Sequence, residues 1–342
     1  MPLMWSKLAT LEVTIDDVDL LHHELPLPAF KRLTTVVRLA GDGHEGRGED
    51  VAYDPIDQER FRQASIDWPI GEFDLGSFSK ALDAVALFTH EPQQQAYRDY
   101  RRWAVESAAL DLALRQAGLS LHDVLGRTPA PLRFVASTGV GHPPSMEAIE
   151  RVRRRAPASR FKLDVNAGWT QEFLDELAPL GIVDVVDLKG AYQGTPVDTP
   201  ADPELYRRVA ETLADAFIED PAWNEGTAAV LEAHRDRITW DAPIHGVPDI
   251  EALPFQPRVI NIKPSRCGRL ETLCAVYEYC ERHGIGMYGG GQFELGVGRA
   301  QIQALASMFH ADAGNDCSPT EYHDAGAHDS LPASPLASVT WP

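Results

Sequence analysis

Between about residue 133 and residue 322 the sequence alternates short apolar runs with amphipathic stretches, and this alternation constrains the fold more than any other feature. The apolar runs have the length of buried strands, and most stretches between them carry apolar residues at helical spacing. Strands are expected at 134–138, 161–165, 183–188, 216–219, 238–241, 259–263, 285–288 and near 317–322. Helices are expected at 146–155, 171–180, 203–213, 227–234, 270–283 and 299–310, with a stunted one at 248–253. Eight strands with interleaved helices predict an α/β fold, a parallel barrel of the TIM type rather than an open sheet.

The first part of the chain has a different pattern, which predicts a separate α+β domain. Residues 9–20 and 33–40 alternate as strands, and a glycine-rich turn follows at 41–48. Apolar residues then recur at helical spacing over 93–118, with Gly118 as the C-cap. We therefore expect an α+β domain at 1–125 and the barrel, with the functional site, at 126–324. The tail at 325–342 is rich in Pro, Ala and Ser and is expected to lie as a strap on the surface.

The charge balance excludes two classes of partner. The chain has 31 Lys and Arg against 51 Asp and Glu, a net charge of −20, whereas nucleic acids and anionic membranes bind basic faces. No apolar stretch reaches the ~18 residues of a membrane span, and the first residues lack the regions of a signal peptide. The 4 cysteines have no metal-ligand spacing and are expected to be reduced thiols. These features predict a cytoplasmic enzyme whose partner is a small molecule.

Ionisable residues stand where the expected strands end, and this is the main functional signal. Strands two to six each deliver such residues directly from an apolar run, and these are Lys162 and Asp164, Asp187 with Lys189, Glu219, Asp241, and Lys263. Gln292 and Glu294 follow strand seven. The carboxyl ends of barrel strands meet at one mouth, where the chemistry of such barrels is found. Charged strand ends gathered at one mouth therefore predict an active site.

Three of these residues, Asp187, Glu219 and Asp241, are hard oxygen ligands suited to Mg²⁺. A cation also explains how they coexist, because without one the carboxylates would repel each other. Lys162 and Lys263 would flank the metal site, and a lysine beside a divalent cation in a half-buried mouth has a lowered pKa and can act as a general base. The predicted chemistry is abstraction of a proton next to a carboxylate group, with the metal holding the enediolate that forms.

The strand ends belong to motifs that extend over nearly the whole chain. These motifs are Gly43-His-Glu-Gly46-Arg-Gly-Glu49, Ala104-Val-Glu-Ser-Ala-Ala-Leu-Asp-Leu-Ala-Leu114, Leu121-His-Asp-Val-Leu-Gly126, Phe217-Ile-Glu-Asp-Pro221, Asn261-Ile-Lys263 and Gly289-Gly-Gly-Gln-Phe-Glu294-Leu-Gly296. With them the sequence resembles the enolase superfamily, in the style of muconate-lactonising enzymes and mandelate racemase. The resemblance implies a (β/α)7β barrel under an N-terminal capping domain, Mg²⁺ on Asp187, Glu219 and Asp241, and Lys263 as an acid/base. It also implies that loops near 22–30 and 49–54 close over the substrate.

Two strand ends depart from the pattern of such proteins. Strand two usually ends in Lys-x-Lys, with the second lysine in proton transfer, whereas here it reads Lys162-Leu-Asp164. Strand three usually reads Asp-x-Asn, whereas here it reads Asp187-Leu-Lys189. The string at 164–169 also resembles a strand-three motif, but that placement leaves too few strands before it, so we assign it to strand two.

The catalytic candidates are therefore Lys263, Lys162, Lys189 and Asp164. We expect Asp164 to lie within reach of Lys162 or Lys189 and to hold that lysine charged, as a general acid or as a clamp on the substrate carboxylate. Lys263 is then the better candidate for the base, which favours one-base chemistry over two-base racemisation.

Other motifs carry weaker signals. Two G-x-G-x-x-G strings occur, at 41–46 and 284–289, but neither opens a helix, so no dinucleotide cofactor is expected. His245 follows strand five and either contacts the substrate or is an ordinary loop residue. Gln292 and Glu294 either line the site or cap the next helix. Tyr192 and Thr195 leave the same choice between a substrate contact and an ordinary loop position.

Two functional classes stay open on the sequence alone. The first is a Mg²⁺-dependent lyase or isomerase that removes the α-proton of a carboxylate substrate. Dehydration, cycloisomerisation and epimerisation all fit, because one enediolate serves all three. The second class is a metal-binding barrel that has lost turnover and acts as a binding or regulatory protein, and the changed ends of strands two and three are its only support. We also expect the chain to form a homo-oligomer.

Overall fold

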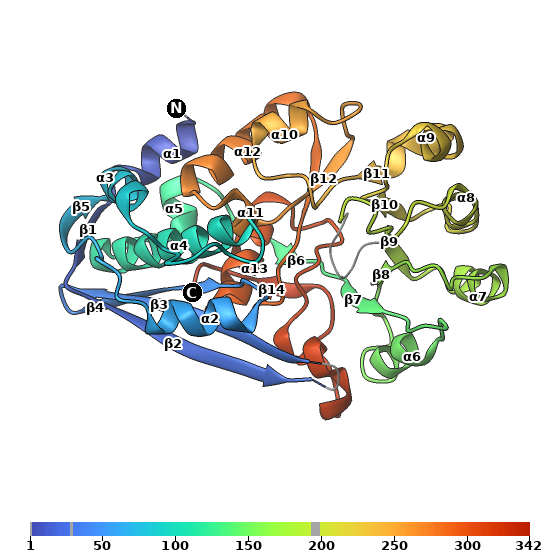
Figure 1. Cartoon of the computed structure of the whole chain (residues 1–342), viewed down its shortest axis with the longest axis horizontal. Helices are drawn as coiled ribbons and strands as arrows, with labels where there is room; N and C mark the ends of the chain where they lie inside the picture. The colour runs from blue at the N-terminus through green and yellow to red at the C-terminus, as the bar shows by residue number, and fades with distance from the viewer. Residues whose placement is uncertain (1, 28–29, 193–198) are drawn as a thin grey trace.

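Parallel strands with helices between them form the larger part of the computed structural model, which describes residues 2–27, 30–192 and 199–342 (Figure 1). Five strands pair in chain order in one sheet: β7 (Ala136–Gly139), β8 (Phe161–Asp164), β9 (Val183–Asp187), β10 (Phe217–Glu219) and β11 (Ile238–Thr239). Beside them β12 (Val259–Ile262) and β13 (Gly286–Gly289) pair in parallel. Because β8 is the second strand in this order, the Lys-Leu-Asp motif ends strand two.

Two residues late in the chain take the eighth place in the barrel. The N–H of Asp316 donates to the carbonyl oxygen of Gly289 at 2.7 Å, and the carbonyl of Asn315 accepts from the N–H of residue 135 at 2.9 Å. The strand expected near 317–322 is therefore wrong. Pro319 has no N–H to offer a ladder, and the chain turns into the 3-10 helix η4 (Thr320–Ala327).

Helices cover the outside of the barrel and agree with the expected ranges to within a few residues. α12 shows how the sequence sets their ends: its last residue precedes Gly284, which takes a left-handed φ of 65° as C-cap. The barrel helices are α6 (Glu147–Arg153), α7 (Gln171–Leu177) with η2 (Ala178–Leu180), α8 (Pro203–Thr212), α9 (Glu225–Leu231) with η3 (Glu232–Arg237), the stunted α10 (Val247–Glu251), α11 (Pro264–Cys267), α12 (Leu270–His283) and α13 (Val297–Phe309).

An antiparallel sheet packed on a long helix forms the N-terminal part. The expected strand at 9–20 is two strands, and the expected turn at 41–48 is confined to residues 42–43. The elements are α1 (Leu3–Leu8), β1 (Glu12–Ile15), β2 (Asp17–Pro26), β3 (Lys31–Gly41), β4 (His44–Asp50), α2 (Pro55–Gln63), β5 (Gly71–Asp74), α3 (Leu75–Ala81), η1 (Leu82–Ala84), α4 (Tyr97–Ala117) and α5 (Leu121–Leu125). β2, β3 and β4 form one sheet, and β1 pairs with β5.

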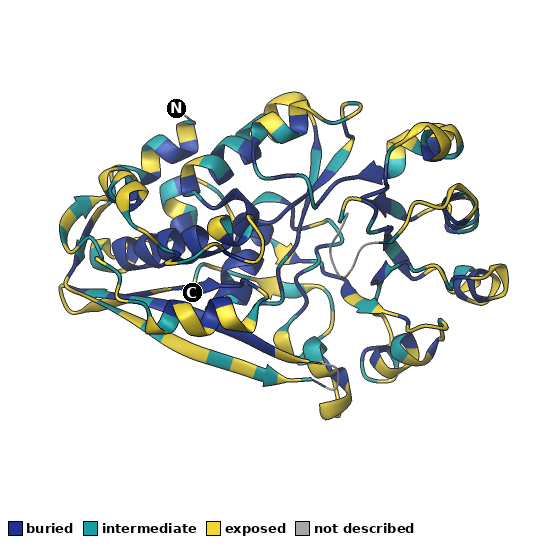
Figure 2. Cartoon of the chain, viewed as in Figure 1, coloured by how far each residue is buried: buried dark blue, intermediate teal, exposed yellow. Residues whose placement is uncertain are grey.

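Close packing of β4 on α4 explains two glycines of the Gly-rich stretch. A Cβ on Gly46 would lie 2.2 Å from the backbone nitrogen of Leu112, and one on Gly48 would lie 2.0 Å from the carbonyl oxygen of Ala104. No side chain fits at either position. α4 is accordingly buried along most of its length, as Figure 2 shows.

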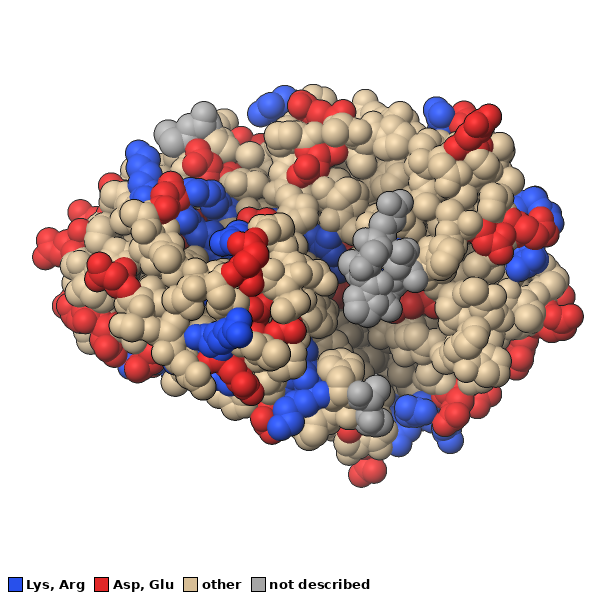
Figure 3. Space-filling view, viewed as in Figure 1, with Lys and Arg blue, Asp and Glu red and all other residues tan. Residues whose placement is uncertain are grey.

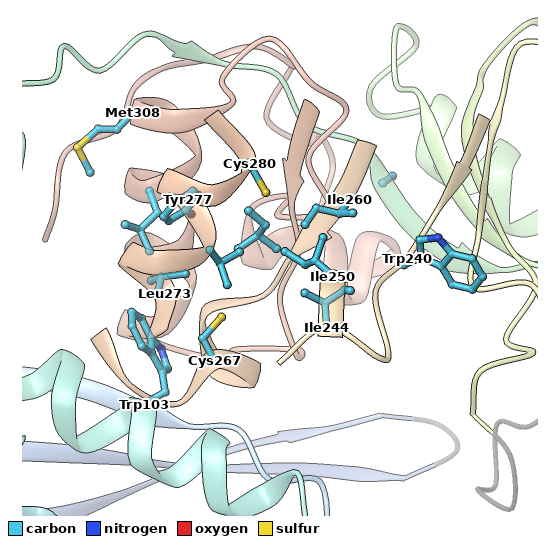
Figure 4. Close-up of a cluster of buried hydrophobic side chains, with 14 of the residues drawn as sticks. Trp103, Trp240, Ile244, Ile250, Ile260, Cys267, Leu273, Tyr277, Cys280 and Met308 are labelled. Carbon is cyan, nitrogen blue, oxygen red and sulfur yellow. The ribbon is translucent and has the colours of Figure 1, made fainter. Parts of the chain in front are cut away.

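One continuous hydrophobic core joins the N-terminal part to the barrel. Figure 4 shows Trp103 of α4 next to Cys267 and Leu273 of the barrel, with Ile260 of β12 in the same cluster. All four cysteines are free and buried. The tail adds β14 (Leu336–Ser338), which pairs with β6 (Pro131–Leu132). Within the described residues no helix is long and apolar enough to cross a membrane.

Candidate active site

A cavity of about 470 Å³ lies at the carboxyl ends of the barrel strands. The four catalytic candidates from the sequence all line it: Lys162, Asp164, Lys189 and Lys263. Phe30 and Tyr53 of the N-terminal part contribute to its rim. Figure 3 shows this face of the molecule, with acidic groups scattered around a hollow near its middle. The strand ends of β8, β9 and β10 form what we call the first wall, and those of β11, β12 and β13 form the second wall.

Buried carboxylates gather between the two walls. Asp187 and Glu219 end neighbouring strands in register, and both are fully buried. Oxygen atoms of these two residues and of Asp220 all lie within 4.8 Å of one another. Asp220 has a φ of 49° and turns its carboxylate to the next strand end, where it accepts hydrogen bonds from the N–H groups of Asp241 and Ala242 at 2.8 and 2.9 Å. Both carboxylate oxygens of Asp220 are thus used in backbone hydrogen bonds.

These carboxyl groups oppose one another electrostatically. Burial raises the pKa of Glu219 to about 8, with the negative charges of Asp187 and Asp241 adding to it and Lys162 acting against it. Burial and the neighbouring Asp241 raise the pKa of Asp220 to about 7. Glu219 and Asp220 therefore resist ionisation, mainly because they are buried and in addition because the neighbouring carboxylates repel them. Burial also opposes ionisation of Asp187, but Lys189 and Lys162 outweigh it and lower its pKa.

Lys162 lies under this cluster and compensates it. Its Nζ is 2.5 Å from Oε1 of Glu219, 3.4 Å from Oδ2 of Asp316 and 3.6 Å from Oδ2 of Asp187. Burial alone would lower the pKa of Lys162, but these carboxylates outweigh it and raise the pKa well above the usual value. The sequence analysis missed Asp316 because the last strand was expected to begin after it, near residue 317.

Lys189, and not Lys162, forms the ion pair with Asp164. Its Nζ lies 3.1 Å from Oδ1 of Asp164 and 2.5 Å from Oδ2 of Asp187. Burial opposes the charge of Lys189, yet the two carboxylates raise its pKa well above the usual value. Its backbone has a φ of 55°, uncommon for a residue with a side chain. Of the two alternatives for Asp164, the structure therefore favours Lys189.

Lys263 on the second wall has a different environment. Its Nζ contacts one carboxylate, Oδ2 of Asp241, at 2.8 Å, and Arg266 reaches the same oxygen at 3.4 Å. Burial and the positive charges of Lys162 and Arg266 act against the ammonium form, whereas Asp241 raises the pKa of Lys263. The neighbouring carboxylates thus raise the pKa values of all three lysines, rather than lowering them as expected from the sequence.

The donor set fits a divalent cation. Asp241 is buried, and its Oδ1 has no hydrogen-bond partner. The two walls and the eighth position of the barrel together carry six carboxylates and four cationic side chains, which leaves two negative charges when all are ionised. These residues are Asp164, Asp187, Glu219, Asp220, Asp241 and, at the eighth position, Asp316, with Lys162, Lys189, Lys263 and Arg266. Mg²⁺ prefers hard oxygen ligands, and its two positive charges would balance the two uncompensated negative charges of this site.

Three residues expected at the substrate lie elsewhere. His245 turns its Nδ1 to Asp99 of α4 at 3.1 Å and lies outside the cavity. The amide group of Gln292 donates to the hydroxyl of Tyr100 at 2.9 Å, and Glu294 lies 3.2 Å from Arg299. Neither caps α13. Tyr192 donates to Oδ2 of Asp241 at 3.1 Å, and Thr195 lies outside the described residues.

Comparisons with known proteins show what this chain is similar to. Two family models match: the C-terminal domain of a domain of unknown function, DUF8230, over residues 128–324, and its N-terminal domain over residues 6–124. The chain is 28% identical to an N-succinylamino acid racemase of Thermus thermophilus over 298 residues, which cover 81% of this chain and 76% of the relative. It is 27% identical to an o-succinylbenzoate synthase of Geobacillus kaustophilus over 78% of this chain and 72% of that one.

Solved structures share the fold. A dipeptide epimerase of Methylococcus capsulatus complexed with Mg ion superposes with a TM-score of 0.67 at 23% identity over 89% of both chains. A muconate lactonizing enzyme superposes with a TM-score of 0.65 at 21% identity, covering 89% of this chain and 88% of the other.

Proposed function

Because the chain belongs to the DUF8230 family and is an enolase-superfamily lyase or isomerase, we propose that it removes the α-proton of a small carboxylate substrate in a Mg²⁺-dependent reaction. The observation that carries this proposal is the cavity in which lysines from both walls face buried carboxylates. Lys189 and Lys263 come from strands three and six of the barrel, so they approach a bound substrate from different sides. A proton acceptor and a charged group can then act on one carbon.

Asp187, Glu219 and Asp241 are the residues that would hold the cation. Asp220 is the weaker candidate because its carboxylate already accepts two backbone hydrogen bonds. A bound Mg²⁺ would supply positive charge to the substrate carboxylate as negative charge develops there. The three ligands end consecutive strands, which leaves positions open on the cavity side for substrate oxygens.

Lys263 is the proposed base. It contacts a single carboxylate, that of Asp241, and shares it with Arg266, whereas Lys162 and Lys189 each contact more than one. Lys189 is the proposed charged group, held in place by Asp164 and Asp187 and suited to bind the substrate carboxylate or to return a proton. Lys162 is buried beneath the carboxylates and is proposed to neutralise them rather than to move protons.

Deuterium wash-in tests the proposal directly. The purified protein is incubated in D₂O with N-succinyl amino acids, with Mg²⁺ or after chelation, and the α-position is followed by NMR. The o-succinylbenzoate synthase reaction is assayed in parallel. We expect exchange or conversion that depends on Mg²⁺. Binding of Mg²⁺ without exchange or conversion of any member of the panel would contradict proton abstraction and favour a binding role.

A further inference from the structure

The segment from residue 292 to residue 298 joins β13 to α13 and forms one side of the cavity through Phe293. This segment belongs to the barrel, but its main-chain polar groups are bound by the N-terminal sheet. Two buried side chains of opposite charge make these contacts, and each binds a different half of the segment.

Arg32 of β3 binds the first half. Its guanidinium donates to the carbonyl oxygens of Gln292 and Phe293 at 2.8 and 3.2 Å. Its other two hydrogen bonds go to the carbonyls of Val51 and Ala52, at 2.8 and 2.9 Å. Arg32 is 1% exposed, and it forms no ion pair with any residue that the structure describes. The hydrogen bonds of this buried guanidinium go only to carbonyl oxygens, and its face packs on the ring of Tyr53 at 4.2 Å. A buried charge without an ion pair is costly, so these contacts depend on one another.

Glu49 of β4 binds the second half. Its carboxylate accepts hydrogen bonds from the N–H groups of Leu295 at 2.7 Å, Gly296 at 3.0 Å and Gly298 at 2.9 Å. These are the free N–H groups at the start of α13, where a negative charge is favoured. The capping role that the sequence left open for Glu294 is thus taken by a residue of the N-terminal sheet.

Phe293 lies between the two contacts in a strained conformation. Its φ is 61°, a region that residues with side chains seldom occupy unless their surroundings impose it. Its ring stacks on His323 with the centroids 4.1 Å apart and lies 6.3 Å from the ring of Phe30. Phe293, Phe30 and Tyr53 make one side of the cavity aromatic, whereas the lysines make the other side charged.

We propose that Arg32 and Glu49 are positioning residues that set substrate specificity, because they hold Phe293 as a wall for a flat apolar group on the carboxylate substrate. The inference rests on the proposed function and names the distal part of its substrate. The charged side of the cavity binds the carboxylate end, and the aromatic side receives the apolar end. Neither Arg32 nor Glu49 lines the cavity itself. Glu49 acts through the segment, and Arg32 acts through the segment and through the ring of Tyr53, on which it packs.

The test compares N-succinylphenylalanine with N-succinylalanine in the full-length wild type, Arg32→Gln, Glu49→Gln and Phe293→Ala. We expect the wild type to prefer the phenylalanine compound. In each variant the KM for that compound should rise about tenfold, while the KM for the alanine compound changes much less. Arg101→Gln is the matched control, because Arg101 is equally buried but bonds only Asp50, Asp57 and Leu87, away from the segment. It should keep the preference.

Amide hydrogen exchange separates positioning from general loss of structure. Arg32→Gln and Glu49→Gln should speed exchange at Leu295, Gly296 and Gly298, whereas Phe293→Ala should not. A wild type without preference, or variants that lower kcat equally for both compounds with KM unchanged, would overturn the proposal. If Arg32→Gln does not fold, Glu49→Gln and Phe293→Ala decide. If the wild type turns over neither compound, the inference of a flat apolar substrate group fails, while the proposed function is decided by the wider substrate panel. Unchanged exchange in Glu49→Gln would overturn the positioning role as well.

Discussion

The two walls of the site hold the same residue type in different electrostatic surroundings. On the first wall, Lys162 contacts three carboxylates and Lys189 contacts two. On the second wall, Lys263 contacts one carboxylate and shares it with Arg266. A lysine surrounded by several carboxylates keeps its proton, whereas a lysine that competes with an arginine for a single carboxylate releases it more easily. We therefore propose that the walls have different roles, with charge compensation on the first and proton removal on the second.

The largest expected effect comes from removing a carboxylate of the first wall. Glu219→Ala should abolish Mg²⁺ binding in calorimetry and leave the barrel folded, because Asp187 and Asp241 alone cannot complete the ligand set. The wild type should also gain thermal stability with Mg²⁺, since the ion binds only the folded state. Full Mg²⁺ affinity in Glu219→Ala would show that the ion lies elsewhere. Glu225→Ala, on the outer α9, serves as the control and should bind the ion normally.

Lys263→Ala should lower α-proton exchange by about 10²–10⁴-fold, the usual contribution of a general base. Lys189→Ala is expected to weaken binding of the substrate more than exchange at saturation. Deuterium wash-in, followed by NMR on both variants, tests whether the lysines of the two walls have these different roles. Should Lys263→Ala still exchange at the wild-type rate, the base belongs to the first wall.

Lys162→Met should destabilise the ion-free protein by about 3–5 kcal/mol, because it leaves buried carboxylates without their partner. Added Mg²⁺ should recover most of this loss, since the ion supplies charge to the same oxygens. Urea unfolding with and without Mg²⁺ measures both effects. A variant as stable as the wild type without Mg²⁺ would mean that Lys162 does not compensate the cluster.

The smallest effect concerns the support of the second wall. His310 is buried behind Gly289, with its Nδ1 2.6 Å from the side-chain oxygen of Asn315. Burial lowers the pKa of His310 to about 4 from 6.5. A lowered histidine pKa favours the neutral form in the folded state, so this stability is complete above pH 6.5 and declines as the pH falls toward 4. The loss reaches about 3 kcal/mol there.

Unfolding in urea at pH 7 and at pH 4.5 measures this decline, and His310→Gln should reduce it. His245→Gln is the control, because its ring is partly exposed and lies outside the barrel. An equal decline in wild type and His310→Gln would assign the acid sensitivity to other groups.

Features that depend on local pattern could be predicted from the sequence. Apolar runs and helical spacing located β8 to β13, and the residue at each strand end follows from alternation, so Lys162, Asp187 and Glu219 were placed in one mouth. The eighth strand could not be located, because two isolated bridges at Asn315 and Asp316 leave no apolar run to recognise.

Contacts between residues that are far apart along the chain also could not be predicted from the sequence. Asp220 was passed over because alternation along a strand does not foresee its positive φ, which turns the carboxylate to the next strand. Glu49 reaches Leu295 across 246 positions, and no spacing rule connects them. The exchange of lysine and acid between strands two and three was visible as a departure, but only the fold shows that Asp164 and Lys189 meet.

The contacts of Arg32 and Glu49 also bear on how the molecule folds. Two of the four carbonyl groups that bind Arg32, and the three N–H groups that bind Glu49, belong to residues 292–298, so the N-terminal sheet cannot satisfy both side chains until β13 and α13 are in place. Sheet and barrel are then expected to unfold together as one cooperative unit, with a single calorimetric transition. Closure of such distant contacts is slow, because the chain between them must be ordered first.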